Sequence, residues 1–559
     1  MKAQSIYKRV GTLLLILGPL TTLLVSPWSN FDPINLIKLL AVTSLSFAAF
    51  ALSITAKDRN RELNVRGLSY LAGFFVVWML IVLFVSGAPF DQQIWGVFGR
   101  NTGFLTYLSL ILVLLSTSLV QDISFYKKLV EALVLTAVPT TLYALVQVAG
   151  RDPVAWSVMS PFATLGNVNF SSAFFGLASI CSVVLIFQKR FNPVVRLLLL
   201  GMVILDLLII LKTGSIQGFM IFIAGVGIAI YFWIRAKFQS VAVRGTYLGT
   251  GLIGFGLTSL ALLNLGPLAR FVFGETILYR FDYWFAGWNM TLKNPIFGVG
   301  LDSYGDWYRQ LRGEIATLRT NPDRITNTAH NIYLDISASG GFPLLIAYLL
   351  ILGFAARASW RFIRRTSEFD SYFVAMFSAW LAYLIQAAIS INQIGVGIWG
   401  WLFTGGLIGY EIVTRPEGDS SKRKKGEIRA SVNPMPAASA LIGILAFAVG
   451  FALAFIPFSA DMKFKDALQS NSLEALKGSV NRVGSTAYQY ELTLDAALKQ
   501  NNEQEAKIIL EGLLARYPRD FMAWQVRSLL PSSSPEERLE AQKRLLDLDP
   551  FNNSLFRPQ

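Results

Sequence analysis

Long apolar runs constrain this 559-residue chain more than any other feature. About thirteen runs are long enough to cross a bilayer, which takes roughly 17–25 residues for a tilted helix. A helix satisfies its own backbone hydrogen bonds in lipid, so the pattern predicts an all-α polytopic membrane protein. Some runs are short or broken by glycine, and twelve spans would also fit. The predicted spans are 10–26, 34–55, 67–87, 102–120, 129–149, 170–187, 197–212, 218–234, 246–266, 331–354, 371–390, 397–414 and 437–457.

Composition agrees with a membrane protein. Charged residues make up 15% of the chain and hydrophobic residues 53%, whereas soluble domains carry about 25% charged residues. A soluble enzyme and a disordered chain are both excluded. The single cysteine, Cys181, rules out an intramolecular disulfide, and the single histidine, His330, rules out a multi-histidine metal site. We expect no metal and no cofactor.

Basic residues predict the topology. The net charge is +14, but the basic residues form small clusters between the apolar runs, which argues against a nucleic-acid partner. With the N-terminus in the cytoplasm, the segments expected inside carry 25 Lys and Arg, and the outside loops before the tail carry 10. This bias follows the positive-inside rule. An odd number of spans then places the chain after residue 457 outside.

The chain therefore divides into a membrane domain, 1–457, and a small charged tail, 458–559. The membrane domain carries a large outside loop, 267–330, in which 275–293 and 301–319 are expected to be amphipathic helices.

In the tail, a segment around Pro518 recurs loosely around Pro550, with helical patterns over 521–530 and 535–548 between them. A period near 34 residues is typical of tetratricopeptide helices. Such a tail either binds a protein partner or forms a helical cap without a ligand.

His330 is the candidate catalytic residue, because it ends the outside loop where a membrane helix begins. A lone histidine is more often structural, but an imidazole has an ordinary pKa near ~6.5, which suits a general base. Asp335 lies inside the following span, and intramembrane carboxylates are functional candidates. Because Asp335 is four residues after Asn331, we expect it to orient the Asn331 amide rather than touch His330.

Three basic residues are candidates for binding an anion: Arg280, Arg100 and Lys212. A guanidinium matches phosphate oxygens two at a time. Arg280, Trp284 and Trp288 share one helix face, so this helix either anchors at the interface or presents Arg280 over a cavity. Arginines near an interface can also simply reach for water.

The sequence lacks a Walker loop, a DxD-type nucleotide-sugar site, a Gly-x-Ser-x-Gly elbow and HExxH. An enzyme here would need a pre-activated substrate. Beside a bilayer, a lipid-linked pyrophosphate meets that need, since its good leaving group requires only a base and cationic groups.

These motifs resemble those of the bacterial O-antigen ligase and O-antigen polymerase superfamily over roughly residues 60–415. The resemblance rests on order and spacing, since no single motif would suffice. One departure is that the turn after the seventh span usually ends in arginine, whereas Ile216 stands here; Lys212 could supply that charge. The matching segments are Gly99-Arg100-Asn-Thr-Gly103, Thr164-Leu-Gly166-Asn167-Val-Asn169, Arg280 to Trp284, Asn294-Pro295-Ile-Phe-Gly298-Val-Gly300, Asn327-Thr-Ala-His330-Asn331-Ile-Tyr-Leu334 and Ser339-Gly340-Gly341.

The resemblance implies a metal-independent glycosyltransferase with a GT-C-like helical architecture in the bacterial inner membrane. Its donor would be an undecaprenyl-pyrophosphate-linked glycan, and its acceptor a glycan, lipid or protein outside, in the synthesis of lipopolysaccharide or another cell-surface polysaccharide. It also implies that His330 is the catalytic base and that Arg280 and Arg100 bind the pyrophosphate.

Three alternatives to a ligase remain open. A polymerase of the same superfamily would use another lipid-linked glycan as acceptor. A lipid-linked oligosaccharide flippase would concentrate polar groups at mid-membrane, often with repeated halves. Here the charges gather on the outer face and no inverted repeat is visible, which favours the enzyme. The third alternative is a structural membrane scaffold.

Overall fold

The computed structural model describes residues 2–56, 59–156, 160–416 and 436–552. Within these residues every regular element is a helix. The all-α prediction is confirmed.

The membrane bundle consists of eleven long apolar helices and two shorter ones among the described residues. Each of the thirteen predicted spans overlaps one of these helices, and the eleven long ones confirm the polytopic prediction. The two shorter helices are α5 (Phe104–Leu119) and α16 (Ser371–Ala387). The long ones are α1 (Lys2–Leu23), α2 (Asn35–Thr55), α3 (Arg59–Val85), α6 (Ile123–Val148), α7 (Val168–Ile186), α8 (Pro193–Thr213), α9 (Gln217–Lys237), α10 (Val241–Leu262), α15 (Ile332–Arg365), α17 (Ile394–Val413) and α18 (Pro436–Ser470).

Helix α15, which follows His330, is broken at Gly340 and Gly341. Gly341 has φ +72°, and a Cβ there would lie 2.2 Å from the carbonyl oxygen of Ile296, so glycine is required on both counts. The freed backbone groups bind the segment 294–300: Val299 N donates to the Ala338 carbonyl at 2.7 Å, and Phe342 N to the Pro295 carbonyl at 2.8 Å. Two motifs about forty residues apart in sequence are thus one structural unit.

The long loop 267–330 folds into four helices: α11 (Ala269–Val272), α12 (Glu275–Lys293), α13 (Tyr304–Leu311) and α14 (Glu314–Thr320). The predicted helix 275–293 is confirmed. The single helix predicted over 301–319 is wrong, because the chain breaks at Arg312 and Gly313. Arg312 leaves the helix with an extended backbone and buries its guanidinium against Asp549 of the tail.

The tail contains α19 (Leu473–Val480), α20 (Ala487–Lys499), α21 (Glu503–Arg516), α22 (Phe521–Leu529) and α23 (Pro535–Leu548). They pack around a hydrophobic core of their own, to which α18 contributes Phe464. The helices predicted over 521–530 and 535–548 are confirmed as α22 and α23. The assignment to a tetratricopeptide repeat stays a prediction.

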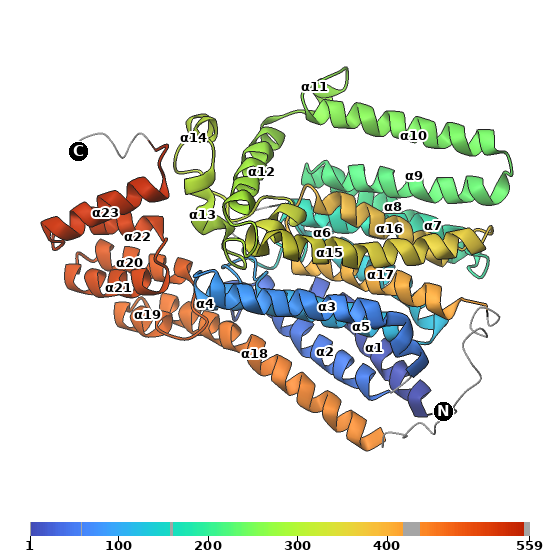
Figure 1. Ribbon diagram of the computed structural model, residues 1–559, viewed down its shortest axis with the longest axis horizontal. Helices are drawn as coiled ribbons and strands as arrows, with labels where there is room; N and C mark the ends of the chain where they lie inside the picture. The colour runs from blue at the N-terminus through green and yellow to red at the C-terminus, as the bar shows by residue number, and fades with distance from the viewer. Residues whose placement is uncertain (1, 57–58, 157–159, 417–435, 553–559) are drawn as a thin grey trace.

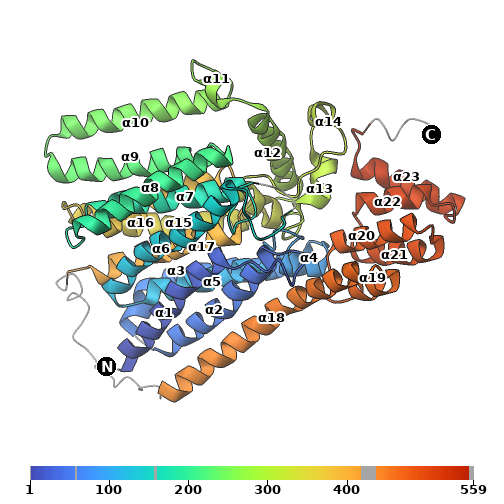
Figure 2. The ribbon, with the colours of Figure 1, turned by 180° about the vertical axis from the view of Figure 1, so that it is seen from behind.

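The tail lies at one end of the membrane bundle and α1 begins at the other, as both views show (Figure 1, Figure 2). Helices α12 to α14 lie beside the tail at the same end. The proposed boundary at residues 457 and 458 falls inside α18, which runs without interruption from the bundle into the tail.

Candidate active site

His330 sits in a tight loop directly before α15. Its backbone is left-handed, with φ +52°, a conformation that costs a non-glycine residue free energy and marks functional loops. Asn331 caps α15 because its side-chain oxygen accepts from Tyr333 N at 3.0 Å and Leu334 N at 3.2 Å. The end of the loop is therefore fixed by the start of the helix.

Asp335 holds the loop that carries His330. Its carboxylate accepts from Thr328 Oγ1 at 2.6 Å and from Ala329 N at 2.7 Å. Thr328 Oγ1 in turn accepts from His330 N at 3.2 Å. The expectation that Asp335 orients the Asn331 amide is wrong, since that amide is engaged as the helix cap. Asp335 is a positioning residue, one turn into α15 and facing back to the loop.

The imidazole of His330 is half-buried and stacks on Tyr283 of α12, with ring centroids 5.4 Å apart. Burial, together with the nearby charges of Arg280 and Arg100, lowers the His330 pKa to about 4. The ring is therefore neutral at pH 7 and can accept a proton. Two arginines from separate segments are close enough to act on one imidazole.

Arg280 is the less engaged of these two cations. It is half-buried, and it forms no hydrogen bond or ion pair with any residue that the structure describes. Burial lowers its pKa below the usual value. One turn further along α12, the indole Nε1 of Trp284 is also buried without a partner. A guanidinium and an indole N–H are thus both left for a ligand.

Arg100 is held more firmly, at a side-chain exposure of 12%. It donates to the main-chain and side-chain oxygens of Asn327, the latter at 3.3 Å, and lies 3.6 Å from Asp302. Its Nε is buried and has no hydrogen-bond partner among the described residues. Asp302 also accepts from Val97 N at 2.9 Å, so it fixes the loop on which Arg100 stands.

Sequence analysis missed Asp302, Asn327 and Tyr283 as parts of this site. Asp302 follows Gly300 by two residues, with φ +52°, and the glycine pair before it was the available signal. Asn327 opens the motif that ends in His330. Tyr283 lies three residues after Arg280, on the neighbouring helix face.

A family comparison fits this geometry. Residues 201–349 match the O-antigen ligase family. The match includes Arg280, the loop helices, His330 and the broken start of α15, and it confirms the resemblance seen in the sequence. It supports a membrane protein of ligase or polymerase type that acts on glycans. No curated protein matches the chain.

The matched O-antigen ligase segment also contains Lys212, which the structure does not bring to the site. Lys212 is exposed at the end of α8 and forms no hydrogen bond or ion pair with the described residues. Ile216, at the position usually held by arginine, is 53% exposed. Between them, Ser215 donates to the Asn169 side chain at 2.8 Å, so the turn after α8 meets the segment 164–169 there.

Arg100 and the tail lie outside the matched O-antigen ligase segment.

Among the described residues, no group of three His, Cys, Asp or Glu side chains is close enough to share a metal ion.

Proposed function

We propose that this protein is a glycosyltransferase that moves a glycan from an undecaprenyl-pyrophosphate carrier onto an acceptor hydroxyl at the outer face of the bacterial inner membrane. One observation carries the proposal: the only imidazole of the chain lies beside two arginines, one of which has no partner among the described residues. A base next to fixed positive charge suits a reaction in which a hydroxyl is deprotonated while an anionic group leaves.

In the proposed step, a nitrogen of His330 takes the proton of the acceptor hydroxyl as its oxygen attacks the anomeric carbon. The bond between that carbon and the pyrophosphate oxygen breaks, and its electron pair leaves with the pyrophosphate. Arg280, supported by Arg100, stabilises the negative charge that grows there. The proton stays on the imidazole until solvent or the departing pyrophosphate removes it.

The same charges couple donor binding to basicity. In the free protein, the two arginines depress the His330 pKa. A pyrophosphate bound between them offsets their positive charge, so His330 becomes a stronger base once the donor is loaded. This order of events protects against deprotonation before the donor is in place.

A polymerase of the same superfamily would use the same residues, and only its acceptor would differ. The unpaired Arg280 favours either transferase over a flippase, because a transported pyrophosphate would need partners at mid-membrane as well. Helix α12, which carries Arg280, and α4 (Phe90–Trp95), which precedes Arg100, instead lie at the tail end of the bundle (Figure 1).

The proposed topology places the N-terminus in the cytoplasm and the tail outside. A periplasmic reporter fused at Ser470 should be active and one fused at Lys424, which lies outside the described residues, should be inactive. Reversed activities would contradict the proposal and place the site on the wrong face.

The proposed function is tested by glycan analysis of a deletion strain, combined with turnover by the purified chain in nanodiscs supplied with undecaprenyl-pyrophosphate-linked glycan. We expect the strain to lose one surface glycan and to accumulate its lipid-linked precursor. Complementation with the wild-type gene should restore the glycan. An unchanged glycan profile, together with no consumption of donor by the purified chain, would refute a transferase.

A further inference from the structure

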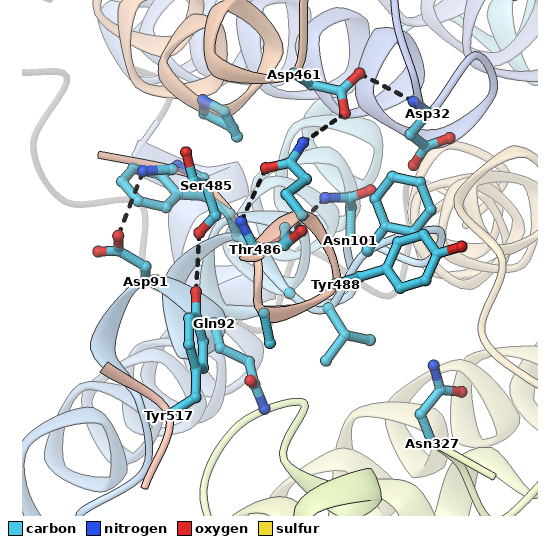
Figure 3. Close-up of a pocket in the computed structure, with 18 of the residues that line it drawn as sticks. Asp32, Asp91, Gln92, Asn101, Asn327, Asp461, Ser485, Thr486, Tyr488 and Tyr517 are labelled. Atoms are coloured by element: carbon cyan, nitrogen blue, oxygen red, sulfur yellow. Dashed lines mark hydrogen bonds between the residues drawn. The ribbon is translucent and has the colours of Figure 1, made fainter. Parts of the chain in front are cut away.

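A cleft of about 370 Å³ lies between the tail and the outside loops of the membrane bundle. One wall is the loop 96–101 that carries Arg100, and the other is the start of α20 in the tail. Figure 3 shows Asp32, Asn101, Asn327 and Tyr488 around this space. The proposed reaction assigns no role to it.

The charge of the lining excludes an anionic occupant. None of the described lining residues is Lys or Arg, so the pyrophosphate of the donor finds no counter-charge there. Six carboxyl groups surround the space, and burial raises the pKa of Asp306 among them to about 7 and that of Asp520 well above its usual value. A carboxylate accepts hydrogen bonds, and a protonated carboxyl both donates and accepts them, so the lining suits hydroxyls and amines. The six are Asp32, Asp91, Asp306, Asp461, Glu491 and Asp520.

One lining residue keeps an unused acceptor. Asn101 is only 3% exposed, and its Oδ1 has no hydrogen-bond partner among the described residues. A buried oxygen without a donor costs free energy, and such an atom beside a cavity indicates a ligand that donates.

An aromatic face completes the lining. Tyr488 is 42% exposed, and its ring packs on Phe98 at 5.0 Å and on Phe31 at 6.2 Å between centroids. An aromatic face packs against the C–H groups of a sugar ring, while carboxylate and amide oxygens bind its hydroxyls. The cleft offers both kinds of group together.

The cleft also adjoins the candidate active site. Asn327 lines it and accepts from Arg100. Asn327 is three residues before His330, and three residues of chain span at most about 11 Å. A saccharide held in the cleft can therefore extend one hydroxyl toward the imidazole.

We propose that this cleft binds the acceptor, and that the acceptor is an uncharged or amino-bearing saccharide. The inference rests on the proposed transferase function and names the acceptor class for it. Donor and acceptor would then meet at the loop 96–101, with the pyrophosphate on the arginine side and the saccharide on the carboxylate side.

The test is saturation-transfer difference NMR on the full chain in nanodiscs. The probes are chitotriose and glucosamine as neutral and amino saccharides, trigalacturonic acid as an acidic one, and trilysine as a basic peptide. We expect chitotriose or glucosamine to bind and trigalacturonic acid not to bind. Tyr488→Ala should weaken saccharide binding about 3–10-fold, since an aromatic contact of this kind contributes about 0.5–1.5 kcal/mol.

Two further variants test the same inference if Tyr488→Ala is poorly folded. Glu491→Gln keeps the side-chain shape and should weaken glucosamine more than chitotriose. Leu539→Ala, at an exposed position of α23 that does not line the cleft, should change neither.

Binding of trilysine in place of the saccharides, equal binding of trigalacturonic acid, or binding of no saccharide would each overturn the inference. Because binding is measured without donor, these outcomes are separate from failure of the proposed function, which shows as absent donor consumption by the wild-type chain.

Discussion

Two arginine-bearing regions on the outside of this molecule differ in how their charges are satisfied. At the junction of loop and tail, the Arg312 and Asp549 side chains are both fully buried, and Arg312 donates to both carboxylate oxygens at 2.7 Å. At the candidate active site, Arg280 has no partner among the described residues and lies near a neutral imidazole. Paired arginines hold the structure together, whereas an unpaired one beside a base is available to a substrate.

Removing the imidazole of His330 is the most direct test of the role assigned to the candidate active site. His330→Asn should lower turnover about 10²–10⁴-fold, the usual contribution of a general base. Asparagine tolerates the left-handed backbone at this position, so the fold and donor binding should persist. Turnover with purified donor measures the effect, and a thermal melt checks the fold. Full activity would rule out His330 as the base.

Asp549→Asn removes the ion pair with Arg312 at the junction of loop and tail. Removing one partner of a buried ion pair costs about 3–5 kcal/mol, because the other charge stays buried alone. We expect hydrogen exchange to rise in α13 and α23 and the tail to melt earlier. Asp547→Asn is the matched control, since Asp547 is exposed and accepts a hydrogen bond from Gln310 at 3.1 Å. Equal behaviour of the two variants would mean that the junction does not hold the tail.

Substitutions of Arg280 test whether the unpaired arginine at the candidate active site acts on the substrate. Arg280→Ala should cost about 10²–10³ in turnover, the typical loss for one electrostatic donor, and Arg280→Lys should recover only part of it. The same Arg280→Ala change should raise the His330 pKa, so that the acid limb of kcat/KM moves up from about pH 4.

Arg319→Lys provides the control for Arg280, because Arg319 already pairs with Asp282 at 2.7 Å. A fully active Arg280→Lys enzyme would reduce Arg280 to an interfacial anchor.

The smallest expected effect concerns Asp306 of α13, which lines the cleft. Its folded pKa of about 7 is above the ordinary value near 3.8, because it is buried, and Gln92 and Arg519 only partly offset the burial. The folded state therefore binds the proton more tightly, and its contribution to stability is lost as pH rises through about 7. Tail melting should drop between pH 6 and 8.5 in wild type and drop less in Asp306→Asn. An identical drop in both would assign the pH dependence elsewhere.

Much of the fold was predictable from sequence, because local patterns specify it. Hydropathy predicted the eleven long apolar helices and the two shorter ones, and capping and periodicity predicted α12, α22 and α23. The rest depends on contacts between distant residues. The break at Arg312 needs Asp549, 237 residues later, and the break at Gly341 needs the carbonyl of Ile296. No local pattern carries such information.

For the site, sequence supplied His330, Arg280 and Arg100, which the structure brings together. It could not show that Lys212 lies apart or that Asp302 and Asn327 hold Arg100. Asp335 was noticed for the right reason, its depth in an apolar span, but assigned the wrong partner. Its actual partners precede it in a loop whose backbone the sequence leaves undetermined.

Helix α18 ties the tail to the membrane itself. It has 35 residues, about 52 Å at 1.5 Å per residue, against a hydrocarbon layer of about 30 Å. The remainder stands above the lipid and carries both Pro457, which lines the cleft, and Phe464, which belongs to the tail core. A bilayer of different hydrophobic thickness would tilt or shift this rod at a cost of fractions of a kcal/mol per Å. Lipid composition would therefore change the width of the cleft between the tail and the bundle. It would thereby also change how readily a large molecule enters that cleft.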